Sequence, residues 1–178
     1  MRLSRLTAFL GFIFTTLFGC AQVPEVRPAV ANPAYDERLT KLLPFRTPLI
    51  GVEELYAMEE RPVLLDARAR REFEVSHLPG AVFIGYGKDF DETSLRDIPK
   101  DADIVVYCSV GYRSDKMGQD LRERGFTKVR NLYGSLFEWA NRGYPLVNPQ
   151  GLPTDRVHTY NSKWGRWVDN AKIVKVVD

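Results

Sequence analysis

The sequence predicts an α/β domain with a small, mainly parallel sheet and helices on both of its faces. Three apolar runs of strand length occur at residues 63–67, 81–84 and 103–107. Runs that are apolar throughout, rather than at alternate positions, are typical of strands buried on both faces of a parallel sheet. A segment with helical spacing follows the third run, so strand and helix alternate along the chain.

The first half of the domain supplies two of these strands. Residues 49–52 predict an entry strand or turn that runs into a short helix. Val63–Ala67 is compact and apolar, and it predicts a buried strand. The charged segment from Arg68 to Ser76 stops at His77-Leu78-Pro79-Gly80, a turn signal. Ala81–Ile84 then predicts the next strand.

The second half places a cysteine between a strand and a helix. Asp103–Tyr107 predicts the third strand, with Cys108 at its carboxyl end. Residues 114–124 carry Met117 and Leu121 four apart, and Gly125 is a suitable helix stop. The remaining expected elements are a strand at residues 129–133 and a helix at 135–141. Sites in α/β folds lie at the carboxyl ends of strands, where Cys108 is.

The first nineteen residues predict a secretory leader. Arg2 and Arg5 precede an apolar run from Leu6 to Phe18, which is shorter than the roughly 20 residues that cross a bilayer. The following Leu17-Phe18-Gly19-Cys20 resembles the lipobox of bacterial lipoproteins, although Phe18 departs from the small residue preferred there. An ordinary secretory leader with an incidental cysteine is the alternative.

The lipobox resemblance implies that Cys20 is lipidated and becomes the mature N-terminus. The protein would then be anchored in the bacterial cell envelope, facing the periplasm, with several acyl chains giving stable membrane attachment. The residue after the lipidated cysteine is Ala21 and not an aspartate, and by family analogy this favours attachment to the outer membrane over the inner membrane. Another envelope protein is a possible partner.

These sequence features divide the chain into four parts. Residues 1–19 are the leader, and residues 20–48 are a proline-rich tether with a short helix around Tyr35–Leu43. Residues 49–146 are the domain. Residues 147–178 form an extension with an aromatic cluster, interpreted as packing back over the domain or, less favoured, as a membrane or partner contact.

Charge and cysteine content exclude several classes of function. The chain has 25 basic and 23 acidic residues. Removing Arg2 and Arg5 with the leader leaves equal numbers of basic and acidic residues. No extended basic run is present, so we do not expect nucleic acid as a partner. Two cysteines, Cys20 and Cys108, are too few for a disulfide scaffold or a four-cysteine zinc site. No metal site is predicted.

The loop that follows the third strand predicts a reactive cysteine. Backbone N–H groups of a strand-to-helix loop converge on the Cys108 sulfur, and the helix N-terminus adds partial positive charge; both favour the thiolate. Gly111 permits the tight curl, Arg113 faces a bound anion or braces the loop, and Ser114 can cap the helix. A buried cysteine that merely packs is the alternative.

This loop, Cys108-Ser109-Val110-Gly111-Tyr112-Arg113-Ser114, resembles the active-site loop of the rhodanese family. Asp66-Ala67-Arg68, His77-Leu78-Pro79-Gly80-Ala81, and Gly134 with Trp139 are further matches in the family's order. Two departures are Gly134-Ser135, where the family commonly has two glycines, and Tyr112, an aromatic side chain that narrows the approach to the sulfur.

The resemblance implies a rhodanese-like fold and sulfurtransferase activity without a metal or organic cofactor. Cys108 would take sulfane sulfur from a small thiosulfate-type or persulfide donor and pass it to a thiol or cyanide-like acceptor. The backbone of Val110 to Arg113 would cradle the persulfide. Asp66 and Arg68 would hold the surrounding loops, and His77 would fix its turn.

Three other interpretations remain open from the sequence. Related cysteine phosphatases share the strand-loop-helix layout but have one more residue between cysteine and arginine. A binding module without sulfur transfer is the second interpretation, and inactive domains of that kind usually lack the cysteine. The third is a thiol redox partner, which would need a resolving cysteine from another protein.

Overall fold

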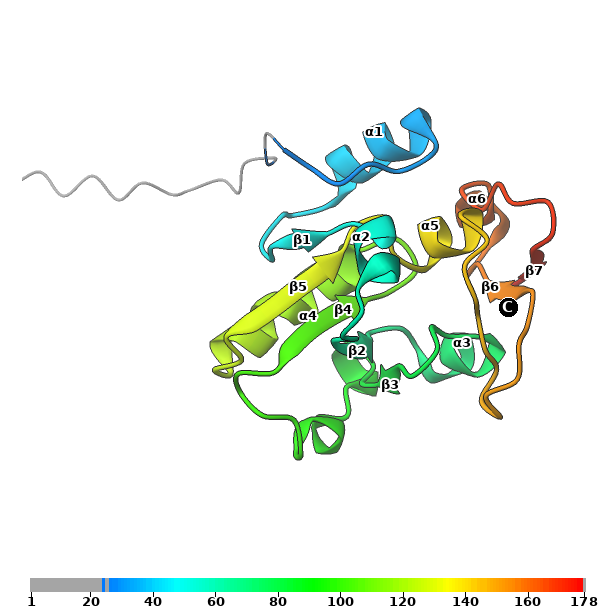
Figure 1. Cartoon of the computed structure of the whole chain (residues 1–178). Coiled ribbons are helices and arrows are strands. Elements are labelled where there is room, and N and C mark those ends of the chain that lie inside the picture. Colours follow the sequence, from blue (N-terminus) through cyan, green and yellow to red (C-terminus); the bar gives the residue numbers. More distant parts are fainter. Residues whose placement is uncertain (1–23, 25, 178) are drawn as a thin grey trace, which may run out of the picture.

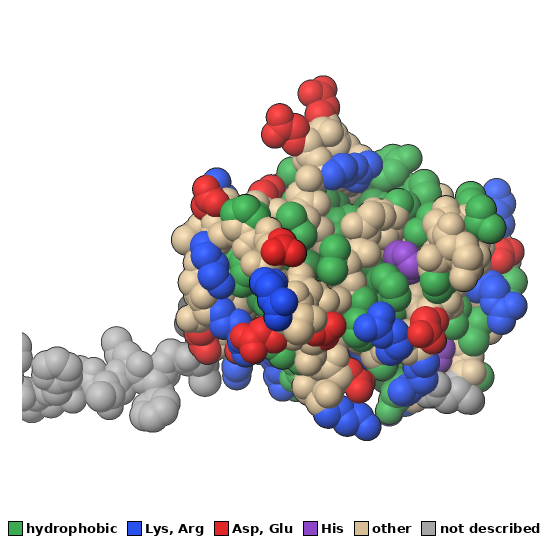
Figure 2. Space-filling view, turned by 90° about the horizontal axis from the view of Figure 1, so that it is seen from below, with side chains coloured by type: hydrophobic (Ala, Val, Ile, Leu, Met, Phe, Trp, Pro, Cys, Tyr) green, Lys and Arg blue, Asp and Glu red, His purple; other side chains and the backbone are tan. Residues whose placement is uncertain are grey.

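The structure of the protein is a computed structural model that describes residue 24 and residues 26–177 (Figure 1). The expected leader and the lipidation site at Cys20 lie outside these residues. Among the described residues, none of the helices combines the length and the apolar character needed to cross a membrane. On the face shown in Figure 2, acidic and basic side chains are interspersed around an area of apolar side chains.

The domain is built on a five-stranded sheet in which every strand pair is parallel. Its order is β1-β5-β4-β2-β3, so β4, which leads to Cys108, lies at the centre. The strands are β1 (Leu49–Ile50), β2 (Val63–Asp66), β3 (Val82–Phe83), β4 (Asp103–Tyr107) and β5 (Lys128–Leu132). The predicted fold class is confirmed.

Helices cover both faces because the central strand is apolar on both sides. Val105 and Tyr107 face one core, and Ile104 and Val106 face a second core that contains Met117. The first core is closed by α1, α2 and α5, and the second by α4 (Figure 1). The helices are α1 (Pro33–Leu42), α2 (Val52–Ala57), α3 (Arg70–Val75), α4 (Tyr112–Glu123) and α5 (Ser135–Asn141), with short 3₁₀ turns at Gly87–Asp89 and Glu92–Leu95.

Helix α1 belongs to the folded domain. Pro33 occupies its first turn, where a missing N–H costs no hydrogen bond, and the Asn32 side chain accepts hydrogen bonds from Ala34 N and Tyr35 N at 2.9 and 3.2 Å. Tyr35 and Leu39 are fully buried, and the Tyr35 hydroxyl donates to Gly134 O at 2.9 Å. A short helix was expected in this segment. The prediction that the segment is a tether outside the domain is wrong for residues 33–42, because α1 packs into the core.

The C-terminal extension packs back over the domain. It contains β6 (Arg156–His158), α6 (Ser162–Gly165) and β7 (Val174–Val176), and β6 and β7 pair in parallel. Val157 and Val168 are buried in the first core. His77 N donates to Val147 O at 2.9 Å, and Val147 N donates to His77 O at 3.0 Å. The extension therefore lies at the end of the sheet that carries Cys108.

Candidate active site around Cys108

Helix α5 fixes the backbone of the loop that begins at Cys108. Leu136 N donates to Cys108 O and Phe137 N donates to Ser109 O, both at 3.1 Å. Cys108 N donates to the Ser135 hydroxyl oxygen at 2.8 Å. The N–H groups at the start of α5, which have no partner within the helix, thus satisfy two carbonyls of the loop. Cys108 itself is 1% exposed.

The sulfur is held inside the curl of the loop. Gly111 has φ +105°, which a residue with a side chain rarely adopts, and its N–H donates to Cys108 Sγ at 3.1 Å. This turn starts α4 at Tyr112, two residues before the expected start. Ser114 was expected to cap the helix, but it lies inside the first turn and does not cap it. Gly111 is the cap residue.

Asn131 of β5 holds the loop from the neighbouring strand. Its side-chain amide donates to Gly111 O at 3.1 Å, and its Oδ1 accepts from the Ser114 hydroxyl at 2.7 Å. Asn131 and Ser114 are both fully buried. The hydroxyl proton of Ser114 is used in this bond, and the backbone N–H of Ser114 hydrogen-bonds the Cys108 sulfur.

The surroundings of Cys108 favour its thiolate. Burial raises the pKa of the Cys108 thiol, but the charge of Arg113 and hydrogen bonds from Ser114 and Gly111 outweigh it, so this pKa lies below its ordinary value. The N-terminus of α4 contributes partial positive charge at the same place. A thiolate in a largely apolar enclosure is a reactive nucleophile.

Arg113 is tied to Glu72 of α3. Its guanidinium donates to both carboxylate oxygens of Glu72 at 2.6 and 2.8 Å, and to the Ser109 hydroxyl at 3.0 Å. Ser109 Oγ in turn donates to Glu72 Oε1 at 3.0 Å. Of the two roles predicted for Arg113, facing a bound anion or bracing the loop, these contacts favour the second. The carboxylate of Glu72 also neutralises most of the guanidinium charge.

The ion pair strongly perturbs Glu72. Burial raises the pKa of its carboxyl, but the hydrogen bonds and charge of Arg113, the charge of Arg68 and the N–H of Ala69 lower it more, to about 2. The pKa of Arg113 is raised by the same pair, against the opposing effect of burial. Both groups stay charged throughout the physiological range.

Asp66 and Arg68 form a second buried ion pair behind the loop. Arg68 Nη2 donates to Asp66 Oδ2 at 2.7 Å and to Ser76 O at 2.6 Å, and both charged side chains are 0% exposed. This pair links the end of β2 to the end of α3, the helix that carries Glu72. The supporting role of Asp66 and Arg68 stays a prediction, and these contacts are the basis for it.

His77 lies at the turn after α3. Its Nδ1 is 3.1 Å from Phe73 O, and its ring stacks on the Phe73 ring with centroids 3.9 Å apart. Burial lowers the pKa of His77 more than the contact with Phe73 O raises it. These contacts fix the turn, and His77 is not among the residues that line the pocket over Cys108.

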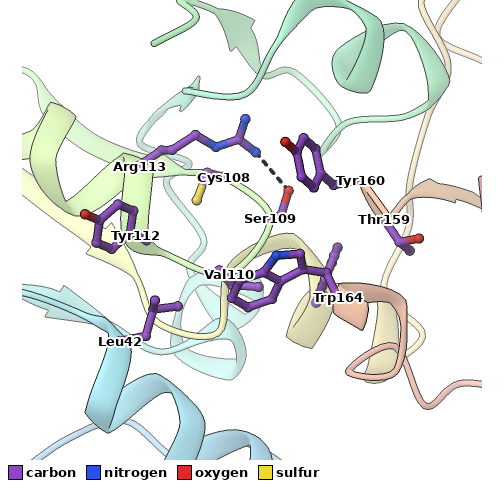
Figure 3. A pocket seen from close by; sticks show the side chains of 10 residues that line it. Leu42, Cys108, Ser109, Val110, Tyr112, Arg113, Thr159, Tyr160 and Trp164 are labelled. Carbon is purple, nitrogen blue, oxygen red and sulfur yellow. Dashed lines mark hydrogen bonds between the residues drawn. The ribbon is translucent and has the colours of Figure 1, made fainter. Parts of the chain in front are cut away.

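A pocket of about 400 Å³ opens over the sulfur (Figure 3). The predicted loop supplies its floor through Cys108, Ser109, Val110, Tyr112 and Arg113. Its walls are hydrophobic or aromatic for the most part and come from distant segments: Leu42 of α1, Phe137 of α5, and Thr159, Tyr160 and Trp164 of the extension. Figure 3 shows the Tyr160 and Trp164 rings on the side of the extension.

The sequence identified the loop but missed several of its partners. Glu72 lies in a charged segment that gave no helical period, so nothing marked its carboxylate as buried. Asn131 lies in a strand that was recognised by its apolar residues alone. Ser135 was noted as a departure from a glycine pair, and it has φ +56°, a conformation that glycine adopts more readily.

Comparisons with known proteins identify the domain. The family model described as Rhodanese-like domain matches residues 51–142. A protein named Sulfurtransferase from Allochromatium vinosum is 34% identical over 101 residues, which cover 57% of this chain and 92% of that protein. A tRNA uridine(34) hydroxylase from Erwinia tasmaniensis is 32% identical over 106 residues, but the match spans only 29% of its length.

A solved structure shows the same fold. The rhodanese-like domain of an Anabaena protein, determined in solution, superposes with a TM-score of 0.52 at 26% identity, over 57% of this chain and 79% of that domain.

Proposed function

The chain belongs to the rhodanese-like domain family, and from this premise we propose that it is a sulfurtransferase that works through a persulfide on Cys108. The donor is a thiosulfate-type or persulfide compound, and the acceptor is a thiol or another thiophile such as cyanide. The observation that carries the proposal is the buried Cys108 sulfur, hydrogen-bonded to Gly111 N at 3.1 Å and facing a pocket.

The reaction has two displacement steps. The Cys108 thiolate attacks the outer sulfur of the donor R–S–SH, the donor S–S bond breaks, and R–S⁻ leaves with the electron pair. An acceptor thiolate then attacks the outer sulfur of the Cys108 persulfide, and the Cys108 thiolate leaves. Splitting the transfer into two substitutions at sulfur keeps each barrier low. Both steps balance without a cofactor.

Named groups support each step. N–H groups of the loop, Gly111 among them, and the N-terminus of α4 stabilise the negative sulfur before attack and after departure. Arg113 adds positive charge while Glu72 holds its guanidinium in place. The roles of Asp66, Arg68 and His77 are to position the surrounding loops.

A binding module or a thiol redox partner would use the same fold differently. A binding module needs neither a lowered thiol pKa nor N–H groups aimed at the sulfur, and a redox partner shares the lowered thiol pKa but does not need a pocket above the sulfur. A redox partner would also need a second thiol, and Cys108 is the free cysteine of the described residues. The geometry therefore favours sulfur transfer.

The test is the intact mass of the full-length protein after incubation with a sulfane donor, followed by cyanide. We expect a gain of about 32 daltons, one sulfur atom, that cyanide removes and that the Cys108→Ser variant does not show. A Cys20→Ser variant serves as the matched control and should still gain the mass. No adduct with either thiosulfate or a persulfide donor would contradict the proposal.

The lipid anchor is a separate proposal that rests on the lipobox resemblance of Leu17-Phe18-Gly19-Cys20. We expect the protein to enter the detergent-rich phase of a phase-separating detergent and to incorporate labelled fatty acid at Cys20. The Cys20→Ala variant should lose both properties. Recovery of unlabelled protein in the aqueous phase would support an ordinary secretory leader.

A further inference from the structure

The C-terminal extension is a fixed part of the pocket over Cys108. The Trp167 ring stacks on Tyr35 of α1 with centroids 5.5 Å apart, and Asn141 of α5 binds Trp167 O and Asp169 N at 2.9 and 2.7 Å. Together with the buried Val157, these contacts join the extension to both the N-terminal helix and the core. Its position over the sulfur is set by packing.

Tyr160 is held at the pocket in a conformation that is unfavourable for an aromatic residue. Its φ is +65°, in the left-handed region. Tyr160 N donates to His158 Nδ1 at 3.1 Å, and Asn161 N donates to Thr159 O at 2.7 Å, which fixes the turn on both sides. Tyr160 is 50% exposed as a residue, so core burial does not explain why a tyrosine occupies this position.

Trp164 provides the neighbouring wall. It lies in α6, whose start is capped by Asn161 Oδ1 accepting from Trp164 N at 3.1 Å. Trp164 is partly buried, and the Arg38 guanidinium lies over its ring, 5.4 Å from the centroid. Figure 3 shows that the Trp164 ring lies beside Val110, next to the loop of Cys108.

Charge in the pocket is nearly cancelled. Among the described residues that line it, Arg113 is the one with a basic side chain, and Glu72 binds that guanidinium through both oxygens. A small dianion such as thiosulfate would lose its water without gaining an unpaired cation. A compound with an aromatic or aliphatic group would bury it against Tyr112, Phe137, Tyr160 and Trp164.

We propose that Tyr160 and Trp164 of the extension select sulfur donors that carry an aromatic or aliphatic group on the sulfur to which the sulfane sulfur is bonded. The inference rests on the proposed sulfurtransferase function and names the substrate class of the same site. A volume of about 400 Å³ accommodates one ring and its sulfur substituents. Selectivity thus comes from a segment outside the region that matches the family.

An arylthiosulfonate illustrates the step. The Cys108 thiolate attacks the outer sulfur of Ar–SO₂–S⁻, the bond between the two donor sulfurs breaks, and the sulfinate Ar–SO₂⁻ leaves with the electron pair. The products are the Cys108 persulfide anion and the sulfinate, so atoms balance and two negative charges stand on each side of the step. The ring stays in the aromatic part of the pocket during the attack.

The experiment measures the rate of persulfide formation by intact mass in the full-length protein with benzenethiosulfonate, methanethiosulfonate and thiosulfate. The quantity compared is the ratio of the benzenethiosulfonate rate to the methanethiosulfonate rate, in wild type and variants. The intrinsic reactivity of each donor is common to all variants and cancels. We expect Tyr160→Gly and Trp164→Leu each to lower this ratio by about five- to tenfold.

The variants are chosen to keep the fold intact. Glycine suits the φ of +65° at position 160, so Tyr160→Gly removes the ring and relieves the backbone. Leu152→Ala, in the same extension but 60% exposed and away from the pocket lining, is the matched control and should leave the ratio unchanged. Thermal unfolding of each variant checks the fold.

The two proposals fail differently. If no donor gives a Cys108 persulfide, the sulfurtransferase function is wrong. If persulfides form but the ratio is the same in wild type, Tyr160→Gly and Trp164→Leu, the function stands and the selectivity of the extension is wrong. A wild-type preference for thiosulfate over both thiosulfonates would also overturn it.

Discussion

Replacing Glu72 by glutamine tests the ion pair that braces the Cys108 loop. The change keeps the shape of the side chain, but it removes the negative charge that faces Arg113 at 2.6 and 2.8 Å. A carboxyl pKa lowered from 4.5 to about 2 corresponds to about 3 kcal/mol of stability at neutral pH. Arg113 keeps 26% of its side chain in solvent, so we expect Glu72→Gln to cost about 2–3 kcal/mol.

The measurement is the free energy of unfolding in urea as a function of pH, and the expected loss corresponds to a melting temperature lower by roughly 5–10 °C. Because the pKa of Glu72 is lowered in the folded state, the contribution is complete above pH 4.5 and is lost as the pH falls toward 2. The difference between wild type and Glu72→Gln should therefore narrow in this window.

Glu74→Gln is the matched control, since Glu74 lies in the same helix but is exposed. It should change stability by less than about 0.5 kcal/mol. Equal stabilities of the Glu72 and Glu74 variants, or a gap between wild type and Glu72→Gln that does not narrow at low pH, would refute the reasoning.

Three further predictions concern the groups around the sulfur. Arg113→Gln should raise the pKa of the Cys108 thiol and slow its alkylation by iodoacetamide at pH 7 by about three- to tenfold, with Arg113→Lys in between; an unchanged rate would show that Arg113 does not activate the thiol. Ser135→Ala leaves the buried Cys108 N–H without its acceptor and should cost about 1–3 kcal/mol in urea unfolding, whereas Ser135→Gly should cost about 1 kcal/mol less because glycine suits φ +56°; the reverse order would contradict this. Burial lowers the pKa of His77, so below pH 6.5 the unfolded chain binds a proton at this residue more readily than the folded protein does. The free energy of unfolding should therefore rise with pH in the window below 6.5. His77→Gln should flatten that part of the pH profile while still forming the persulfide.

The sequence predicted the centre of the fold well because its signals there are local. The strand at Asp103–Tyr107 and the helix at Ser135–Asn141 have the bounds expected from an apolar run and from the flanking glycines. The cysteine loop was identified from residue types at fixed offsets. In each of these segments, the property that decides the structure is carried by neighbouring residues.

Signals that depend on tertiary context were missed. Helix α3 buries Glu72, a carboxylate, so a search for apolar periodicity could not find its inner face. Helix α1 follows several prolines and was interpreted as part of a tether, yet Pro33 sits where proline favours the start of a helix.

The pocket walls show the same limit over a longer distance. Leu42 and Trp164 come from opposite ends of the chain and line the same pocket as Cys108. Nothing in the local pattern of either segment records that they meet at the carboxyl end of β4. The aromatic cluster of the extension was recognised, but its position over the sulfur required the fold.

The most direct test of the central claim is to follow one sulfur atom through the protein. The full-length chain is loaded with a donor labelled in its sulfane sulfur, freed of excess donor, and then mixed with an acceptor thiol. We predict close to one label per chain on Cys108, released to the acceptor on mixing, and none retained by Cys108→Ser. Label that never binds, or that stays on the protein after the acceptor is added, would contradict transfer through a Cys108 persulfide.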